Sequence, residues 1–328
     1  MPGRTDVAVV ADVAVVGAGP AGCAAAVQCA RLGLAPRLLD ASGRAGGLAA
    51  NAFRIENYPG LPPLDGPAFA GRLAAHLERF GLTVTPGRLS RLERDGDGFA
   101  LAGDFGGFRA RGAILATGTR ARRLDAPGAA ALAGRTLFHE PRELLAAMPA
   151  PRAVVVIGGG EAALDYALTL AGAGARVTLC LRGSAPRGCR RLQELVARES
   201  RIAVRPDTAV RALAAAPVAP AVGRAAAAAH GGATGAPHRV TDAANGVAVT
   251  LDGGETLAAD AVLVAIGRRA TAADLLTPLG LSARDTVATA HPHLFVAGDA
   301  RLGSLGQAAM AAGDGLAAAA GLAAALTP

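Results

Sequence analysis

The sequence predicts an α/β protein built from two doubly wound units with parallel sheets, and three observations support this prediction. Two glycine-rich turns of one design, GAGPAG at 17–22 and GGGEAA at 158–163, each follow a short run of Val, Ala and Ile. Each turn is followed by a helical segment and a second apolar strand. Hydrophobic residues make up 52% and charged residues 18% of the 328 residues, which supplies two cores of ordinary size.

The first unit is a complete strand, turn, helix and strand. The expected strand 13–16 precedes the turn, a helix extends to about residue 32, and the strand 36–39 ends on Asp40. Such glycines let the backbone approach a pyrophosphate and bring the helix close to the strand. Asp40 stands 23 residues after the first glycine, where a carboxylate accepts hydrogen bonds from an adenosine ribose. The first unit is therefore predicted to be a Rossmann-like dinucleotide site.

The second unit repeats this order with a different ending. We expect a strand at 153–157, a helix at 161–171 and a strand at 176–181, after which Arg182 replaces the acid. Arg187, Arg190 and Arg191 follow within ten residues. Guanidinium groups suit a ribose 2′-phosphate, whereas a carboxylate would repel it, so the pattern favours NADPH, with NADH possible. The alternative is a solvated arginine face at the start of a helix.

Three later apolar runs predict further buried strands. These are 113–116, which leads into Thr117-Gly118, 261–266, which leads into Gly267, and 294–297, which leads into Gly298-Asp299. A helix is expected over 307–320. In contrast, residues 214–244 consist largely of Ala, Gly and Pro, which predicts a partly disordered surface insertion.

The composition excludes several classes of function. The net charge of +7 accompanies only 3% aromatic residues and no Trp, which argues against a nucleic-acid surface. The chain contains no lysine, so Schiff-base chemistry is excluded. Four cysteines are too few and too irregular for a disulfide framework or a zinc site, and no metal site is expected at His291 and His293. Acidic residues interrupt both terminal apolar stretches, so we expect a cytoplasmic protein without a membrane segment.

These residues resemble the flavoproteins of the low-molecular-weight thioredoxin reductase type, within the class II pyridine nucleotide-disulfide oxidoreductases. Besides the two turns and Asp40, the resemblance rests on Gly46-Gly47, Glu56 to Gly60, Ala116 to Gly118, Ala265 to Arg268, Ala297 to Asp299 and Gly306 to Ala309. It covers nearly the whole chain apart from the insertion.

The resemblance implies FAD at the first turn and NADPH at the second, with the NADPH domain (120–265) inserted into the FAD domain (6–119 and 266–328). A homodimer is also implied. The residues it implies for FAD are Gly17, Gly19, Ala21, Gly22, Asp40, Gly47, Asn57, Thr117, Gly118, Gly298, Asp299, Gln307 and Ala308. Those for NADPH are Gly158, Gly160, Glu161, Ala163, Arg182 and Arg187, and Gly267 completes the set.

The chain departs from the family pattern at three points. The expected Cys-x-x-Cys reads Phe138-His139-Glu140-Pro141, so the dithiol that carries electrons out of the flavin is absent. His139 and Glu140 are candidates for chemistry with an electron acceptor, although they could simply begin a helix. The usual His-Arg-Arg reads Leu181-Arg182-Gly183, and Leu48 replaces a common glutamine.

The sequence therefore predicts an FAD-dependent NAD(P)H oxidoreductase that transfers hydride from NADPH to FAD and then to an external acceptor. The acceptor is a small molecule, a quinone or a small redox protein such as ferredoxin. Three alternatives stay open: a ferredoxin or flavodoxin-NADP reductase, a disulfide reductase or oxidase that uses Cys180 or Cys189, and a non-catalytic dinucleotide-binding sensor.

Overall fold

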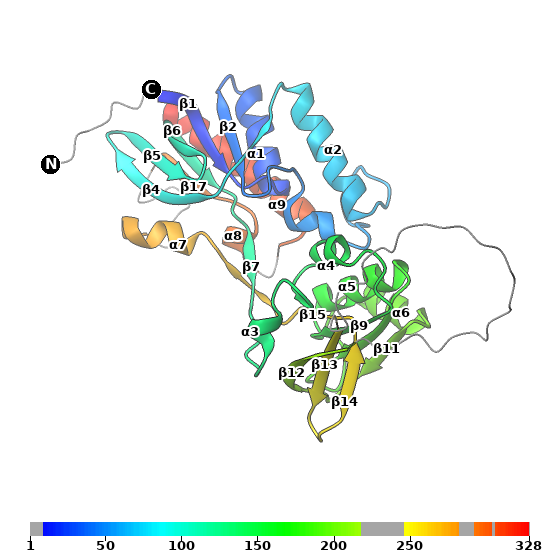
Figure 1. Ribbon diagram of the computed structural model, residues 1–328. Coiled ribbons are helices and arrows are strands. Elements are labelled where there is room, and N and C mark those ends of the chain that lie inside the picture. The colour runs from blue at the N-terminus through cyan, green and yellow to red at the C-terminus, as the bar shows by residue number, and fades with distance from the viewer. Residues whose placement is uncertain (1–8, 218–245, 282–291, 304–305, 328) are drawn as a thin grey trace, which may run out of the picture. The chain divides into compact units, whose positions relative to one another are not determined.

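The computed structural model describes residues 9–217, 246–281, 292–303 and 306–327 (Figure 1). The chain divides into two compact units. Unit 1 comprises residues up to 122 and from 267 onward, and unit 2 comprises residues 123–266. Each unit is described by itself below.

Unit 1 is organised around one mixed sheet with the strand order β3-β2-β1-β6-β5-β4, and β17 pairs with β6. Its parallel strands are β1 (Val9–Val16), β2 (Pro36–Asp40), β3 (Val84–Pro86), β6 (Gly106–Leu115) and β17 (Leu294–Val296). Two antiparallel strands, β4 (Leu89–Asp95) and β5 (Gly98–Gly103), extend the sheet beyond β6. The glycine turn lies at the carboxyl end of β1, the edge where doubly wound sheets bind ligands.

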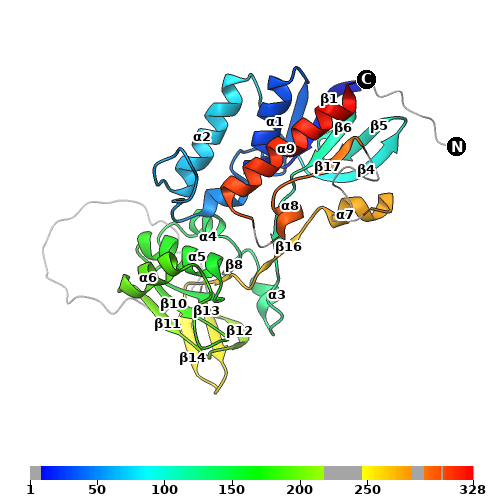
Figure 2. The ribbon, with the colours of Figure 1, turned by 180° about the vertical axis from the view of Figure 1, so that it is seen from behind.

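Helices α1 (Pro20–Arg31) and α9 (Ala308–Leu326) lie side by side in unit 1 (Figures 1 and 2). They approach so closely that a Cβ on Gly315 would overlap the carbonyl oxygen of Ala21. The remaining helical segments of the unit are α2 (Gly66–Arg79), α7 (Ala273–Leu276), α8 (Asp299–Leu302) and the 3₁₀ turns η1 (Gly47–Asn51) and η2 (Thr277–Leu279). Helix α2 begins at Asp65, whose carboxylate accepts the Ala68 N–H at 2.7 Å.

Helix α9 is the one helix in the described part of the chain that is long and apolar enough to cross a membrane by length and composition. Its single charged residue, Asp314, forms an ion pair with Arg301 and accepts the Gly298 N–H at 2.7 Å. Core helices of soluble proteins pass the same test, and α9 packs along α1 within unit 1.

Unit 2 has a parallel sheet with the order β11-β10-β9-β15-β8. Its strands are β8 (Leu137–Phe138), β9 (Ala153–Ile157), β10 (Arg176–Cys180), β11 (Ile202–Arg205) and β15 (Ala261–Val264). An antiparallel sheet of β12 (Val210–Ala216), β13 (Gly246–Leu251) and β14 (Thr256–Ala259) packs against it through a shared apolar cluster (Figure 1). The helices are α3 (Ala129–Leu132), α4 (Pro141–Ala147), α5 (Glu161–Gly172) and α6 (Arg190–Arg198).

The chain passes between the units along a two-stranded antiparallel ribbon, β7 (Thr119–Ala121) and β16 (Arg268–Ala270). The guanidinium of Arg268 ties the two strands together, since it donates to the hydroxyl of Thr119 at 2.8 Å and to its carbonyl at 3.0 Å. The Arg122 N–H also donates to the carbonyl of Gly267 at 2.9 Å.

The predicted α/β class with two Rossmann-like folds is confirmed. The strand at 153–157 ends as predicted, whereas β1 begins earlier at Val9 and α9 continues to Leu326. The predicted insertion begins too early, because Ala214–Ala216 pair with β13 as the end of β12. The rest of that prediction, from 218 onward, lies outside the described residues.

Candidate functional site

The first glycine turn is closed by backbone packing that only glycine permits. Gly17 has φ +104°, and a Cβ there would overlap the carbonyl oxygen of Ala116. A Cβ on Gly22 would overlap the carbonyl oxygen of Gly17 itself. These two glycines therefore set the close approach of α1 to β1, as the sequence predicted for this turn.

Asp40 fixes the same turn from the end of β2. One carboxylate oxygen accepts the Ala18 N–H at 2.9 Å, and the other accepts the backbone N–H and hydroxyl of Ser42 at 2.8 and 2.6 Å. The carbonyl of Ala18 accepts the Gly46 N–H at 2.8 Å. Ala18 is thus held through both its N–H and its carbonyl by other segments of unit 1.

The middle of this turn leaves room for an anion. Gly19 has only the Cα of Gly47 near its Cβ position, at 3.9 Å. Helix α1 begins there with no side-chain cap and no acidic residue in its first turn, and Ala21 lies in that turn. Free N–H groups at a helix start attract phosphates, so the residues present fit a dinucleotide pyrophosphate.

Thr117 supplies a second sign that a ligand belongs to unit 1. Its hydroxyl is buried and has no hydrogen-bond partner among the described residues. The carbonyls of Thr117 and Gly118 both accept the hydroxyl of Thr271, at 3.0 and 3.1 Å. A buried hydroxyl beside the glycine turn, on a backbone that is held in place, is suited to form a hydrogen bond with a polar group of a bound cofactor.

Two predicted residues from distant parts of the sequence meet in unit 1. Asn57 donates from Nδ2 to Oε1 of Gln307 at 2.7 Å, which places the 56–60 segment against the start of α9. Gln307 is the N-cap residue of α9, and Ala308 is its first residue. The helix therefore directs its free N–H groups toward this cluster, which favours nearby negative charge.

Asp299 is a half-buried acid next to this cluster. Burial raises the pKa of its carboxyl, although the positive charge of Arg268 works in the opposite direction. Gly306 lies against it so closely that a Cβ would overlap the carboxylate, and Gly298 has φ +69° with its Cβ position facing Ala21. The close approach of Gly306 to Asp299 and of Gly298 to α1 therefore requires glycine at these two positions.

The second turn is built on the same plan and locked in another way. A Cβ on Gly158 (φ +143°) would overlap the carbonyl oxygen of Ala265, whereas Gly160 faces open space. Glu161 is the first residue of α5, and Ala163 is fully buried beneath the turn. The lock is the N–H of Arg187, which donates to the carbonyl of Gly159 at 2.7 Å.

The arginines of this turn are accessible. Arg182 and Arg187 are both exposed, and the bond from Arg187 to the turn keeps the second of them beside Gly159. Gly188 follows it and passes close to the Cα of Glu161. Both arginines therefore belong to the exposed segment that follows β10 and contacts the second turn.

His139 and Glu140 lie at the end of β8 in unit 2. Nδ1 of His139 lies 3.4 Å from the carbonyl oxygen of Val264, and Glu140 is the N-cap residue of α4. The local structure of this segment is therefore the start of a helix, as the alternative interpretation of the sequence expected. Since β8, β9 and β15 are parallel, His139 occupies the same sheet edge as the second glycine turn.

All four cysteines are free thiols. Cys23, Cys29 and Cys180 are buried, and burial raises their pKa values to about 12, 12 and 11. Cys189 is exposed at the start of α6. Among the described residues, no group of three or more His, Cys, Asp or Glu side chains could hold a metal ion.

The fold and these turns define a doubly wound protein with two dinucleotide-type units. The sequence pattern of the pyridine nucleotide-disulphide oxidoreductases matches residues 11–315. The chain belongs to that family, whose thioredoxin reductase members use FAD and NADPH.

The individual relatives are distant. The chain is 27% identical over 322 residues to a thioredoxin reductase of Listeria monocytogenes, covering 93% of this chain and 90% of the relative. It is 29% identical over 180 residues to that of Bacillus subtilis, covering 52% and 54%. The match to the Bacillus subtilis protein thus spans about half of that protein's length. A crystal structure of Lactococcus lactis thioredoxin reductase aligns with a TM-score of 0.77 at 25% identity, covering 96% and 98%.

Several residues that shape the site carried no signal in the sequence. Asp314 holds the Gly298 N–H from within an alanine-rich helix, and Thr271 holds the Thr117 turn from 154 residues away. In unit 2, the buried carboxylate of Asp260 accepts the N–H groups of Arg152 and Ala153 at 2.6 and 3.0 Å and so fixes the start of β9. For Asp260, the only clue in the sequence was that an acidic residue directly precedes a buried strand.

Proposed function

We propose that the protein is an FAD-dependent NAD(P)H oxidoreductase that passes electrons to an external acceptor without an intramolecular dithiol relay. The proposal assigns FAD to unit 1 and NADPH to unit 2. It rests chiefly on one observation: each unit has a closed glycine turn whose middle glycine, at a helix start, has no atom closer than 3.9 Å to its Cβ position. When bound, the two cofactors supply hydride transfer from the nicotinamide to the flavin.

The chain's own residues bind and orient the cofactors in this proposal. In unit 1, Gly17, Gly22 and Asp40 hold the turn that receives the FAD pyrophosphate. The hydroxyl of Thr117 and the carboxylate of Asp299 bond polar groups of the same cofactor. In unit 2, Arg182 and Arg187 hold the 2′-phosphate, which makes NADPH preferred over NADH.

The absence of a relay is supported by the cysteines. None lies at 138–141, and three of the four are buried with pKa values far above neutral, so they are poor nucleophiles. Cys189 is exposed, but a relay of this type needs a pair. This reasoning also speaks against a disulfide reductase that uses Cys180.

The acceptor side is assigned to His139 and Glu140. The imidazole of His139 is partly buried at the sheet edge, and an imidazole there can pass a proton to an acceptor such as a quinone. A small redox protein such as ferredoxin is the second acceptor class. We further propose a cytoplasmic homodimer, on the strength of the family alone.

The test is anaerobic reduction of the purified protein. We expect a yellow protein whose visible flavin band bleaches with NADPH and more slowly with NADH. Reoxidation is then followed with a quinone, ferredoxin, thioredoxin and oxygen in separate experiments. A protein that binds both nucleotides but is never bleached is a sensor, and one reoxidised fastest by thioredoxin retains a dithiol route.

A further inference from the structure

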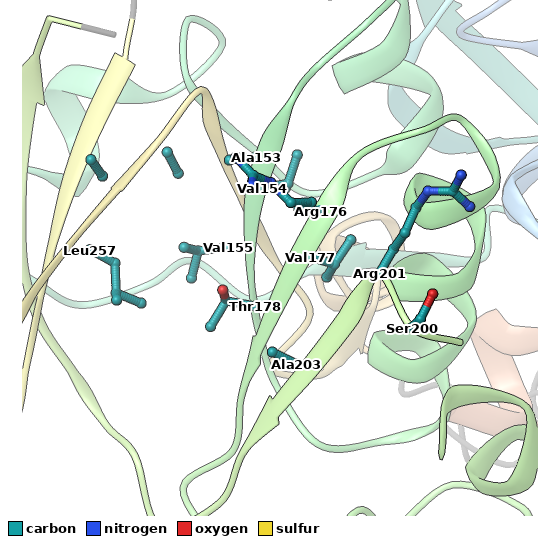
Figure 3. Close-up of a pocket in the computed structure, with 12 residues that line it drawn as sticks. Ala153, Val154, Val155, Arg176, Val177, Thr178, Ser200, Arg201, Ala203 and Leu257 are labelled. Atoms are coloured by element: carbon teal, nitrogen blue, oxygen red, sulfur yellow. The ribbon is translucent and has the colours of Figure 1, made fainter. Parts of the chain in front are cut away.

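Unit 2 holds a cavity of about 350 Å³ that is remote from its glycine turn (Figure 3). We call it the amino-edge pocket, defined by Ala153, Val155, Arg176, Thr178, Ala203 and Leu257 among its lining residues. Figure 3 shows Val155 and Thr178 next to one another, with Leu257 on the side of β14. The volume lies near the lower end of the range of small-molecule sites.

The pocket lies at the opposite end of the sheet from the predicted nucleotide site. It is lined by the first residues of β9 and β10 and by the beginning of β11, whereas the glycine turn follows the last residue of β9. A ligand in this pocket would therefore be distinct from NADPH.

An ion pair joins two elements that contribute lining residues. The Arg205 guanidinium binds the Glu255 carboxylate through both nitrogens, at 2.6 and 2.5 Å. Arg205 lies on the same face of β11 as the lining residue Ala203, because strand residues two apart share a face. Glu255 directly precedes β14, which carries the lining residue Leu257, so the pair ties the edge strand β11 to the antiparallel sheet.

The pocket also has one uncompensated cation. Arg152 pairs with Asp260 at 3.2 Å, and Arg201 lies 3.8 Å from Glu199. Arg176 is exposed and forms no ion pair within the described part of the chain. Figure 3 shows the guanidinium of Arg201 extending away from Leu257 and Thr178, which leaves Arg176 as the cation of the pocket.

We propose that the amino-edge pocket binds a small monocarboxylate with a short apolar chain. The carboxylate lies against Arg176, and the chain lies along Val155, Thr178 and Leu257. Charge complementarity selects an anion over a neutral molecule, because a guanidinium binds a carboxylate through charge-assisted hydrogen bonds. The apolar walls select a chain over an inorganic anion.

The test is titration of the full chain, loaded with its cofactors, with sodium octanoate in a calorimeter. We expect saturable binding that weakens about tenfold or more in Arg176→Gln and is abolished in Ala203→Phe, which fills the pocket from an exposed position. Arg198→Gln, which removes an exposed arginine of α6 outside the pocket, leaves binding unchanged.

Three outcomes would overturn the proposal. The first is binding of neutral 1-octanol as tight as that of octanoate, and the second is absence of saturable octanoate binding. The third is loss of binding in Arg182→Gln but not in Arg176→Gln, since this places the octanoate at the second glycine turn. None of them depends on hydride transfer, so the proposed function is tested separately.

Discussion

The two glycine turns share a backbone plan but differ at the last position and in the residue that locks them. In unit 1 the sixth residue is Gly22, and a Cβ there would overlap the carbonyl of Gly17. In unit 2 that place is taken by Ala163, whose Cβ lies 3.3 Å from the Cβ position of Gly158. The helix of unit 1 thus approaches its turn more tightly than that of unit 2.

The locks differ in kind. The first turn is held by the side-chain carboxylate of Asp40, which accepts the Ala18 N–H, and the second by the backbone N–H of Arg187, which donates to the Gly159 carbonyl. The same backbone plan is therefore presented beside an acid in one unit and beside arginines in the other. Under the proposed function, the glycines set how closely a ligand can approach, and the acid or the arginines beside each turn select the ribose.

The largest expected effect comes from exchanging the sixth residues of the two turns. Gly22→Ala forces a Cβ into a backbone carbonyl, and we expect a loss of about 3 kcal/mol or more in unfolding free energy, with loss of bound flavin. The matched variant Ala163→Gly opens space and costs about 1 kcal/mol. Urea unfolding and flavin content measure both, and equal effects in the two variants would remove the distinction between the turns.

The locking residues give the next prediction. Asp40→Ala removes the acceptor of the Ala18 N–H, and we expect FAD affinity to fall roughly 10- to 100-fold, since hydrogen bonds to a charged group contribute about 1.5–3 kcal/mol. FAD titration of the apoprotein measures this. The NADPH KM of the FAD-saturated variant stays unchanged.

Arg182→Gln is the counterpart in unit 2. We expect about a tenfold rise in KM for NADPH, no change for NADH and no change in FAD affinity. Steady-state kinetics with both nucleotides measure it. A parallel rise in both KM values would mean that Arg182 supports the fold of the turn and does not read the 2′-phosphate.

The sequence predicted these turns well because their physics is local. Glycines, an apolar strand and a helix start lie within 20 residues of one another, and the spacing to Asp40 or Arg182 is set by one helix and one strand. It could not predict the partners that come from far along the chain. Thr271 at the Thr117 turn and Asp314 at Gly298 depend on the packing of separate segments.

The antiparallel sheets were also missed. Strands β4, β5 and β12 are short, and exposed or partly exposed residues separate their few buried ones, so no long buried run marks them. The predicted start of the low-complexity insertion, at Ala214, was wrong for a related reason. Alanines at 214–216 pair with β13 through their backbone, which composition does not reveal.

A smaller effect distinguishes the units by pH, because the half-buried acid Asp299 has no counterpart among the residues at the second turn. Burial raises its pKa above 3.8, so the folded apoprotein binds this proton more readily than the unfolded chain does. Stability contributed by the protonated form is lost as pH rises through the raised pKa. We therefore expect the unfolding free energy of Asp299→Asn to rise relative to that of the parent as the pH increases from 4 to 7.

Urea unfolding of the apoprotein at several pH values measures that gain. Asp97→Asn, at an exposed acid of unit 1, is the control and should follow the parent. A constant difference between Asp299→Asn and the parent across this pH range would show that burial does not disfavour the Asp299 carboxylate.

The smallest expected effect concerns the thiols near the second turn. Cys180 ends β10 just before Arg182, and Cys189 is the N-cap residue of α6 just after Arg187. Both thiols therefore flank the segment that locks the second turn through Arg187. Cys189→Ser replaces an exposed thiol and should leave turnover with every acceptor within about twofold, because a surface substitution changes little. Cys180→Ser places a hydroxyl in a buried site and should lower stability by about 1–3 kcal/mol while leaving kcat unchanged. If instead Cys189→Ser abolished turnover with thioredoxin alone, the second unit would carry a thiol route in its locking segment. The comparison between the two turns would then extend from nucleotide choice to the path of the electrons.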